Sequence, residues 1–441
     1  MRENYKDQDR RAAAGKPVRR PVDPAAWSRL EEVGDLHFHS SAYSSALDYY
    51  RQLLDDRVLG TVSRDAAVEL LRKGIDSHFR LGQLDEAEAL LDRATSLVGR
   101  TSALADPGEN AAVLATFELR RADVYRERGR LHDALKLAKG AFAVLALTDE
   151  HAAVARLQTI VGICHVRLGR QEKAREFFTD GLSTYRRIGQ DLGVANLLNN
   201  LALMEKNHCR WDKALAQMEK AVELAHRVGA SHLMPLFYLN QGIILQKIDR
   251  LGEARTLLEK GLRLAVSLGD RIQETRLNLA MGRLETLAGR YARAETLILN
   301  GKSLADRYRF LRESTIADEY LGDILLLRGD PEKARFNYQI GLEKSRAIAA
   351  GNDLEGELQR RMGEAHLLAG RHDAAIAVSP AAIAICENCG EDYEIGFCHL
   401  TLGKAYAAQI DWQQADHHFR RSIGRFQDQH LPHMWCRAVL D

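Results

Sequence analysis

The sequence lacks most of what marks a membrane, secreted or nucleic-acid-binding protein. Its 441 residues carry a formal net charge of +1, whereas nucleic-acid-binding proteins normally present a basic surface. No apolar run approaches the ~20 residues that a membrane-spanning helix needs, and the charged N-terminus has no apolar stretch of a signal peptide. Six scattered cysteines suit a reducing compartment better than a disulfide framework. We therefore expect a cytoplasmic protein with no direct nucleic-acid partner and no membrane partner.

Proline is scarce and catalytic motifs are missing. Only eight prolines occur, which suits a chain made almost wholly of helices because proline breaks helix interiors. The sequence has no GxxxxGKS/T phosphate loop, no HExxH, no GxSxG and no GxGxxG after a strand. Its 46% hydrophobic and 28% charged residues are typical of an ordered protein. We expect a folded protein that is not an enzyme and uses no cofactor.

What the sequence does contain is a repeat of forty residues. Each copy has a small residue followed twelve positions later by an alanine. The small residues are Ala122, Gly162, Ala202, Gly242, Gly282, Gly322, Gly363 and Gly403, with a slip of one residue before the last two. The alanines are Ala134, Ala174, Ala214, Ala254, Ala294, Ala334, Ala375 and Ala415. With Gly34 before Ala46 and Ile75 before Ala87, ten copies result, and such a fixed period is typical of stacked repeats.

Each copy reads as two helices. Leu157, Val161 and Cys164 follow the i, i+4, i+7 spacing of one helix face. Gly162 beside them predicts a close approach of two helices, and Gly169 predicts the turn between them. The predicted hairpins lie near residues 27–59, 66–98, 115–148, 155–188, 195–228, 235–268, 275–308, 315–349, 356–389 and 396–426. Together they form one solenoid over residues 25–441.

The two ends of the chain differ from the repeats. Residues 1–24 are basic and poor in apolar side chains, so we expect a disordered tail. Residues 431–441 form either a cap or the start of a further repeat. Because the array stops partway through a unit, we expect the chain to be the N-terminal part of a longer protein.

The pattern Gly162, Gly169, Ala174 and Gly181 resembles the tetratricopeptide repeat, which is usually about thirty-four residues long. The longer form found here is similar to the repeats of kinesin light chain, of LGN-type scaffolds, and of bacterial regulators such as MalT and the Rap/PlcR peptide receptors. The resemblance implies an all-α, right-handed solenoid. It also implies a concave groove, lined by the first helix of each repeat, that takes up a peptide or protein segment.

The expected groove carries asparagines and cations. The stripe one position before the packing face contains Asn196, Asn200, Asn207 and Asn240, whose amides offer both a donor and an acceptor to a peptide backbone. The resemblance implies this role for Asn200 and Asn240. Cations on the same stripe predict affinity for an acidic segment. These are Arg156, Arg167, Lys247, Arg276 and Arg283. The alternative is a solvated helix face with no ligand.

Two function classes follow. The first is a non-catalytic scaffold or sensor module of a bacterial signalling or regulatory system, which binds an extended, acidic protein or peptide segment in the groove. The second is the ligand-gated sensor domain of a transcriptional regulator, which takes a small molecule or a short signalling peptide. That second class requires an effector domain, either fused to this chain or docked on it.

One cluster has metal-ligand types. Cys386, Cys389, Cys398 and His399 could supply the four tetrahedral ligands of zinc. However, Cys398 falls in the apolar packing column and Cys389 at a boundary between repeats. The packing interpretation is favoured, and we expect no metal.

Overall fold

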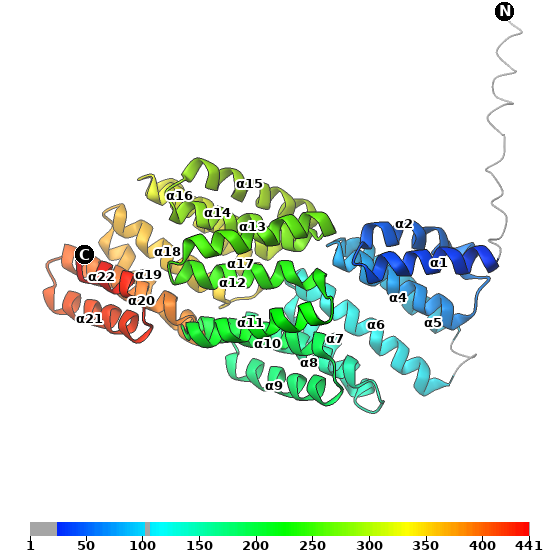
Figure 1. Cartoon of the computed structure of the whole chain (residues 1–441). Helices are drawn as coiled ribbons and strands as arrows, with labels where there is room; N and C mark the ends of the chain where they lie inside the picture. The colour runs from blue at the N-terminus through cyan, green and yellow to red at the C-terminus, as the bar shows by residue number, and fades with distance from the viewer. Residues whose placement is uncertain (1–23, 102–105, 441) are drawn as a thin grey trace, which may run out of the picture.

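The computed structural model describes residues 24–101 and 106–440. Within these residues the chain is helical throughout and forms no strand, which confirms the predicted all-α solenoid. The predicted disordered tail lies outside the described residues, apart from Pro24. Figure 1 shows the helices following one another as antiparallel neighbours along a curved path.

Ten helix pairs make up the repeats, numbered here in chain order. Repeats one to five are α1 (Pro24–His39) with α2 (Tyr43–Leu53), α4 (Arg64–Arg80) with α5 (Leu84–Arg100), α6 (Pro107–Glu127) with α7 (Leu131–Leu145), α8 (His151–Arg167) with α9 (Gln171–Arg187), and α10 (Asp191–Asn207) with α11 (Trp211–Arg227). Repeats six to ten are α12 (Met234–Lys247) with α13 (Leu251–Leu268), α14 (Arg271–Leu287) with α15 (Tyr291–Tyr308), α16 (Leu311–Leu327) with α17 (Pro331–Ile348), α18 (Asp353–Leu368) with α19 (His372–Cys389), and α20 (Asp392–Ala408) with α21 (Trp412–Asp428). The short helices are α3 (Asp56–Leu59), the 3₁₀ turn η2 (Ser231–Leu233) and α22 (Pro432–Leu440).

The small-residue column allows the two helices of a repeat to touch. A Cβ atom added to Gly162 on α8 would overlap the ring of Phe178 on α9. In repeat six, a Cβ on Gly242 would lie 2.6 Å from Leu258. The predicted close approach is therefore confirmed, because a bulkier side chain could enter only by moving the partner helix.

The turn inside each repeat, called here the hairpin turn, contains one residue in the left-handed conformation. Gly129 and Gly169 adopt φ of 79° and 70° there, which glycine accepts without a steric penalty. Asp249 and Ile410 hold the same place in repeats six and ten with φ of 62° and 66°. The Ile410 backbone is strained, since a β-branched residue rarely adopts this conformation.

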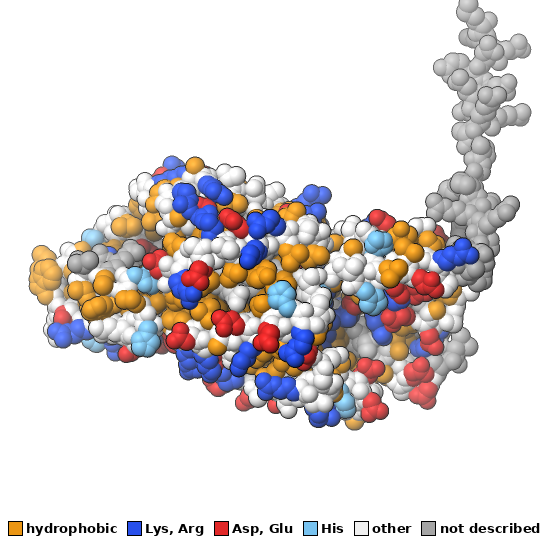
Figure 2. Space-filling view, in the orientation of Figure 1, with side chains coloured by type: hydrophobic (Ala, Val, Ile, Leu, Met, Phe, Trp, Pro, Cys, Tyr) orange, Lys and Arg blue, Asp and Glu red, His pale blue; other side chains and the backbone are white. Residues whose placement is uncertain are grey.

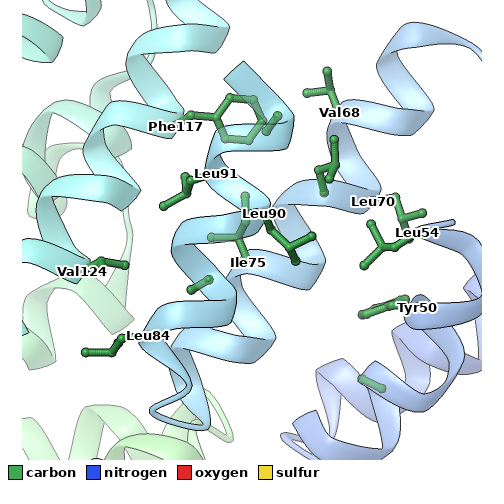
Figure 3. Packing of buried hydrophobic residues seen from close by; sticks show 14 of the residues in the cluster. Tyr50, Leu54, Val68, Leu70, Ile75, Leu84, Leu90, Leu91, Phe117 and Val124 are labelled. Atoms are coloured by element: carbon green, nitrogen blue, oxygen red, sulfur yellow. The ribbon is translucent and has the colours of Figure 1, made fainter. Parts of the chain in front are cut away.

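Hydrophobic side chains fill the space between neighbouring helices and form a chain of linked clusters instead of one central core. In the N-terminal cluster, Tyr50, Ile75, Leu90 and Phe117 come from α2, α4, α5 and α6 (Figure 3). All four are buried. Each repeat thus packs on the next, as expected for a solenoid.

The solenoid also packs on itself after one superhelical turn. Gln171 donates to the carbonyl oxygen of Cys389, and Trp211 donates to that of Gln429, both 218 residues further along. Gly129 similarly lies under Ile348. In each case the hairpin turn of one repeat contacts the end of the fifth repeat after it, so consecutive turns of the superhelix touch (Figure 1).

The outer face drawn in Figure 2 shows acidic and basic side chains interspersed, without one large patch of either sign. None of the described helices is long and apolar enough to cross a membrane.

Candidate functional site: the central cavity

The winding of the solenoid leaves a cavity of about 1040 Å³ on its inner side. We call it the central cavity. The first helices of repeats three to eight supply much of its wall, with apolar side chains from α8, α10, α12, α14 and α16. These are Ile160, Ile163, Leu203, Leu236, Ile243, Leu279 and Ile316.

All four predicted asparagines line the central cavity. Asn196, Asn200 and Asn207 project from α10, and none of them has a side-chain hydrogen bond within the described part of the chain. Asn240 on α12 is buried and donates from Nδ2 to Oδ1 of Asn199 at 2.8 Å. Three amides therefore remain available to a ligand, and the fourth is held in a fixed orientation.

Three of the four predicted arginines, Arg156, Arg167 and Arg276, line the cavity but are already paired. Arg156 bonds Asp123 at 2.7 Å. Arg276 bridges Glu127 at 2.9 Å and Glu313 at 2.6 Å. Their charges are therefore neutralised by the protein, contrary to the expectation of a field of free positive charge.

Arg167 belongs to the same network. It donates to the carbonyl oxygen of Arg126 at 2.7 Å and lies 3.7 Å from the carboxylate of Glu127. Burial alone would raise the pKa of Glu127, but Arg126, Arg276 and Arg167 together lower it below its usual range. Glu127 therefore stays ionised in this network.

Two of the predicted site residues do not line the central cavity. Lys247 bonds Glu394 at 3.2 Å and lies 4.0 Å from the ring centre of Tyr393. Arg283 lies over the ring of Tyr320, with 5.3 Å between guanidinium and ring centre. Both cations hold helices together and are unavailable to a ligand in the cavity.

Asp123 and Glu127 were missed by the sequence analysis, although a signal existed. The stripe that carries the predicted asparagines and cations advances along each first helix by steps of 4, 3 and 4 residues, and the same steps give four residues in repeat three. They are Thr116, Arg120, Asp123 and Glu127, and all line the central cavity. Extending the stripe to repeat three therefore predicts that the cavity wall contains carboxylates as well as cations.

One cation in the wall, Arg80 at the end of α4, makes no ion pair or hydrogen bond within residues 24–101 and 106–440. Its charge acts on Asp270, another residue of the wall, and lowers the pKa of that carboxyl against the larger effect of burial. Two acids in the wall are poorly compensated. Burial raises the pKa of Asp270 to about 6 and that of Glu391 to about 7.

The hypothetical zinc cluster does not assemble. Among the described residues, no three or more His, Cys, Asp or Glu side chains lie close enough to hold a metal ion. His399 pairs instead with His418, with 3.0 Å between the two Nδ1 atoms. Cys389 lies 3.5 Å from the carbonyl oxygen of Gly351, in the contact between turns. The two cysteines Cys386 and Cys398 are buried among packed helices.

Comparison with known proteins agrees with the repeat geometry. The tetratricopeptide-repeat family model matches residues 113–187 and 354–428, which hold repeats three and four and repeats nine and ten. These two segments carry tetratricopeptide repeats. No curated protein sequence matches it significantly.

Several solved structures match the chain at low sequence identity. The apo form of RapI is 19% identical with a TM-score of 0.46, over 64% of this chain and 98% of that one. The apo quorum sensor NprR from B. thuringiensis is 13% identical with a TM-score of 0.49, over 81% and 99%. Aspartyl phosphate phosphatase F from Bacillus subtilis is 12% identical with a TM-score of 0.47, over 76% and 96%.

Proposed function

We propose that this protein is a non-catalytic binding module that holds a short, extended peptide segment in the central cavity, within a signalling or regulatory system. The observation that carries the proposal is the row of Asn196, Asn200 and Asn207, whose amides face the cavity without a protein partner. Each amide can accept from a backbone N–H and donate to a backbone carbonyl oxygen, whatever the peptide's side chains are.

The shape and lining of the cavity suit such a ligand. Its volume of about 1040 Å³ is at the upper end of the ~300–1,000 Å³ that is common for ligand sites. Apolar side chains such as Ile160, Leu203 and Ile243 alternate with the amides in the wall. Peptide side chains can therefore bury against the wall while their backbone is bonded by asparagines.

The preference for acidic segments has a narrower basis than the sequence indicated. Since Arg156, Arg167 and Arg276 already pair with protein carboxylates, Arg80 is the cation we assign to a ligand carboxylate. Such a contact would be a charge-assisted hydrogen bond, about twice as strong as a neutral one. We propose a segment with one acidic side chain near Arg80, instead of a uniformly acidic one.

The contacts between turns favour a second candidate within the same class, a ligand-gated sensor. The hydrogen bonds from Gln171 and Trp211 join repeats four and five, whose first helices line the cavity, to the overlying superhelical turn. A ligand that binds better when the turns separate would shift the chain to an open form, because a ligand shifts an equilibrium by its difference in affinity. Small-angle scattering with and without ligand distinguishes this candidate, which requires an increase in radius of gyration.

The test uses the double variant Asn196→Ala, Asn200→Ala. Its probe is an array of short random-sequence peptides, on which wild-type protein should select a subset. The double variant should lose that subset, with an affinity loss of about tenfold or more for two hydrogen bonds. Asn300→Ala is the matched control, because Asn300 is exposed on α15 and does not line the cavity.

Circular dichroism should show that both variants keep wild-type helicity, so that a loss of binding does not reflect unfolding. Equal binding by wild type and the double variant would overturn the proposal, as would absence of any selected peptide. The single variant Arg80→Ala should bind the acidic peptides of the selected subset more weakly. It should bind the neutral peptides of that subset as wild type does.

A further inference from the structure

The hairpin turns of the last four repeats form an exposed, apolar edge. We call its large hydrophobic residues the rim. Each of repeats seven to ten contributes one or two of them. They are Leu287, Leu327, Leu368, Ile410 and Trp412, exposed to 50%, 57%, 60%, 72% and 65%. Single exposed hydrophobic residues are common on protein surfaces, but a regular row marks an interaction site.

The same turns in earlier repeats are covered by the overlying superhelical turn. A Cβ added to Gly129 would lie 3.3 Å from Ile348, and one added to Gly169 would lie 3.1 Å from Cys389. The equivalent Gly289, Gly329 and Gly370 have no atom within 4 Å in the described structure. The rim is therefore the uncovered continuation of an interface that the chain already makes with itself.

The rim exposes apolar side chains at positions where a solvent-exposed surface would favour charged ones. Leu287, Leu327 and Leu368 occupy the column that holds Glu127 in repeat three and Lys247 in repeat six. The charged members of this column are buried in ion pairs, while the leucines are exposed. Such a pattern is expected where the leucines are covered in an assembly.

Trp412 supports this interpretation through its counterpart. Trp211, at the same position in repeat five, is buried and donates from Nε1 to the carbonyl oxygen of Gln429 at 2.9 Å. Trp412 begins α21 as Trp211 begins α11, but nothing in the described residues lies over it. Ile410 beside it keeps a strained left-handed backbone at φ 66° while presenting its side chain outward.

The covering face is also present in the chain, at the opposite end. In the existing interface the covering residues stand at repeat ends, such as Ile348, Cys389 and Gln429. The equivalent ends of repeats three to five are open. Leu147 and Val228 are exposed there, and neither Gly189 nor Gly229 has an atom within 4 Å of an added Cβ.

We propose that the rim binds the repeat-three to repeat-five ends of a second copy of this chain, head to tail, so that the superhelix continues from one copy into the next. The register follows from the existing interface, in which each hairpin turn lies under the end of the fifth repeat after it. Hairpin turns eight, nine and ten then lie under the ends of repeats three, four and five of the second copy. Leu327 faces the segment at Leu147, and Trp412 faces the segment at Val228.

Such an interface joins two different surfaces, so it leaves one free rim and one free covering face on every dimer. Association of this kind produces longer chains or rings as concentration rises. The rim lies outside the central cavity, whereas Val228 on the covering face also lines it. Variants of the rim therefore test this inference without altering the proposed peptide site.

Sedimentation velocity of the full chain over a range of concentrations tests the proposal. Wild type should grow in mass with concentration. Leu327→Glu with Leu368→Glu removes the rim, Leu147→Glu with Val228→Glu removes the covering face, and each double variant should remain monomeric. An equimolar mixture of the two should form a dimer that grows no further, because each partner retains one intact and different face.

Phe336→Glu is the matched control, since Phe336 is an exposed hydrophobic residue on α17 outside both faces. It should associate as wild type does, and all variants should keep wild-type helicity. A wild type that stays monomeric overturns the proposal, as does association that survives in either double variant. A mixture of the two variants that fails to form dimers overturns the head-to-tail arrangement.

Discussion

The indole Nε1 of Trp211 donates to the carbonyl oxygen of Gln429 at 2.9 Å, although the two residues are 218 positions apart. A nearest-neighbour stack of repeats would contain no such contact, because each repeat would touch only the adjacent ones. The hydrogen bond therefore ties together two superhelical turns.

Trp211→Ala should lower the free energy of unfolding by about 3–5 kcal/mol, the usual cost of removing a buried aromatic side chain. Trp211→Phe should retain much of the packing and lose the donor, at about 1 kcal/mol. Trp412→Ala is the control at the equivalent exposed position, with an expected change within about 0.5 kcal/mol. Urea unfolding of dilute protein measures all three, and equal losses from the two alanine variants would contradict the assigned contact.

Two glycine substitutions should change stability in opposite directions. Gly162→Ala places a methyl group against the ring of Phe178, and overpacking of this kind costs about 1–3 kcal/mol. Gly140→Ala, in the middle of the exposed face of α7, meets no atom within 4 Å. It should stabilise the protein by about 0.5–1 kcal/mol through helix propensity. Thermal unfolding compares the two variants, and a shift of the same sign in both would contradict the close helix approach.

The sequence predicted the repeats because their determinants are local. Gly162 and Gly169 act within one hairpin, and their spacing is visible without knowledge of the superhelix. The partners of the groove cations were not predictable in this way. Arg276 binds Glu127, 149 residues away, and this pairing depends on the pitch of the solenoid. Asp123 could have been predicted as a cavity residue from the stripe in repeat three. The covering of Gly129 by Ile348 could not have been predicted, because it depends on the three-dimensional path of the chain.

Arg276→Met should be severely destabilising. Arg276 is the shared partner of Glu127 and Glu313, and both carboxylates are buried. Removing one partner of a buried ion pair typically costs about 3–5 kcal/mol, and here Glu313 is the carboxylate left without compensation, because Glu127 keeps Arg126 at 2.8 Å. Chemical unfolding at neutral pH measures the loss. Arg420→Met breaks an exposed pair with Asp416 and should leave the unfolding midpoint unchanged; a comparable loss in the control would contradict the special role of Arg276.

Glu391→Gln should alter the pH dependence of stability. Glu391 is buried at the start of α20. Burial raises its pKa to about 7 against the ordinary value of 4.5; Lys206 and Lys247 oppose this rise, and Glu357 and Asp353 add to it. Between these values the folded protein retains a proton that the unfolded chain has released. Wild-type stability therefore falls as the pH rises from 4.5 to about 7.

The glutamine variant cannot ionise at this position, so its stability relative to wild type should increase across the same window and stay constant above it. The full difference should be about 3.5 kcal/mol, since the pKa rises from 4.5 to about 7 and each pKa unit corresponds to about 1.4 kcal/mol. Urea unfolding at a series of pH values measures it, and other titrating groups cancel in the comparison. Glu176→Gln, exposed on α9, removes the same charge from the surface. A difference between Glu391→Gln and wild type that is flat from pH 4.5 to 7, or that decreases with pH, would show that Glu391 ionises normally in the folded protein.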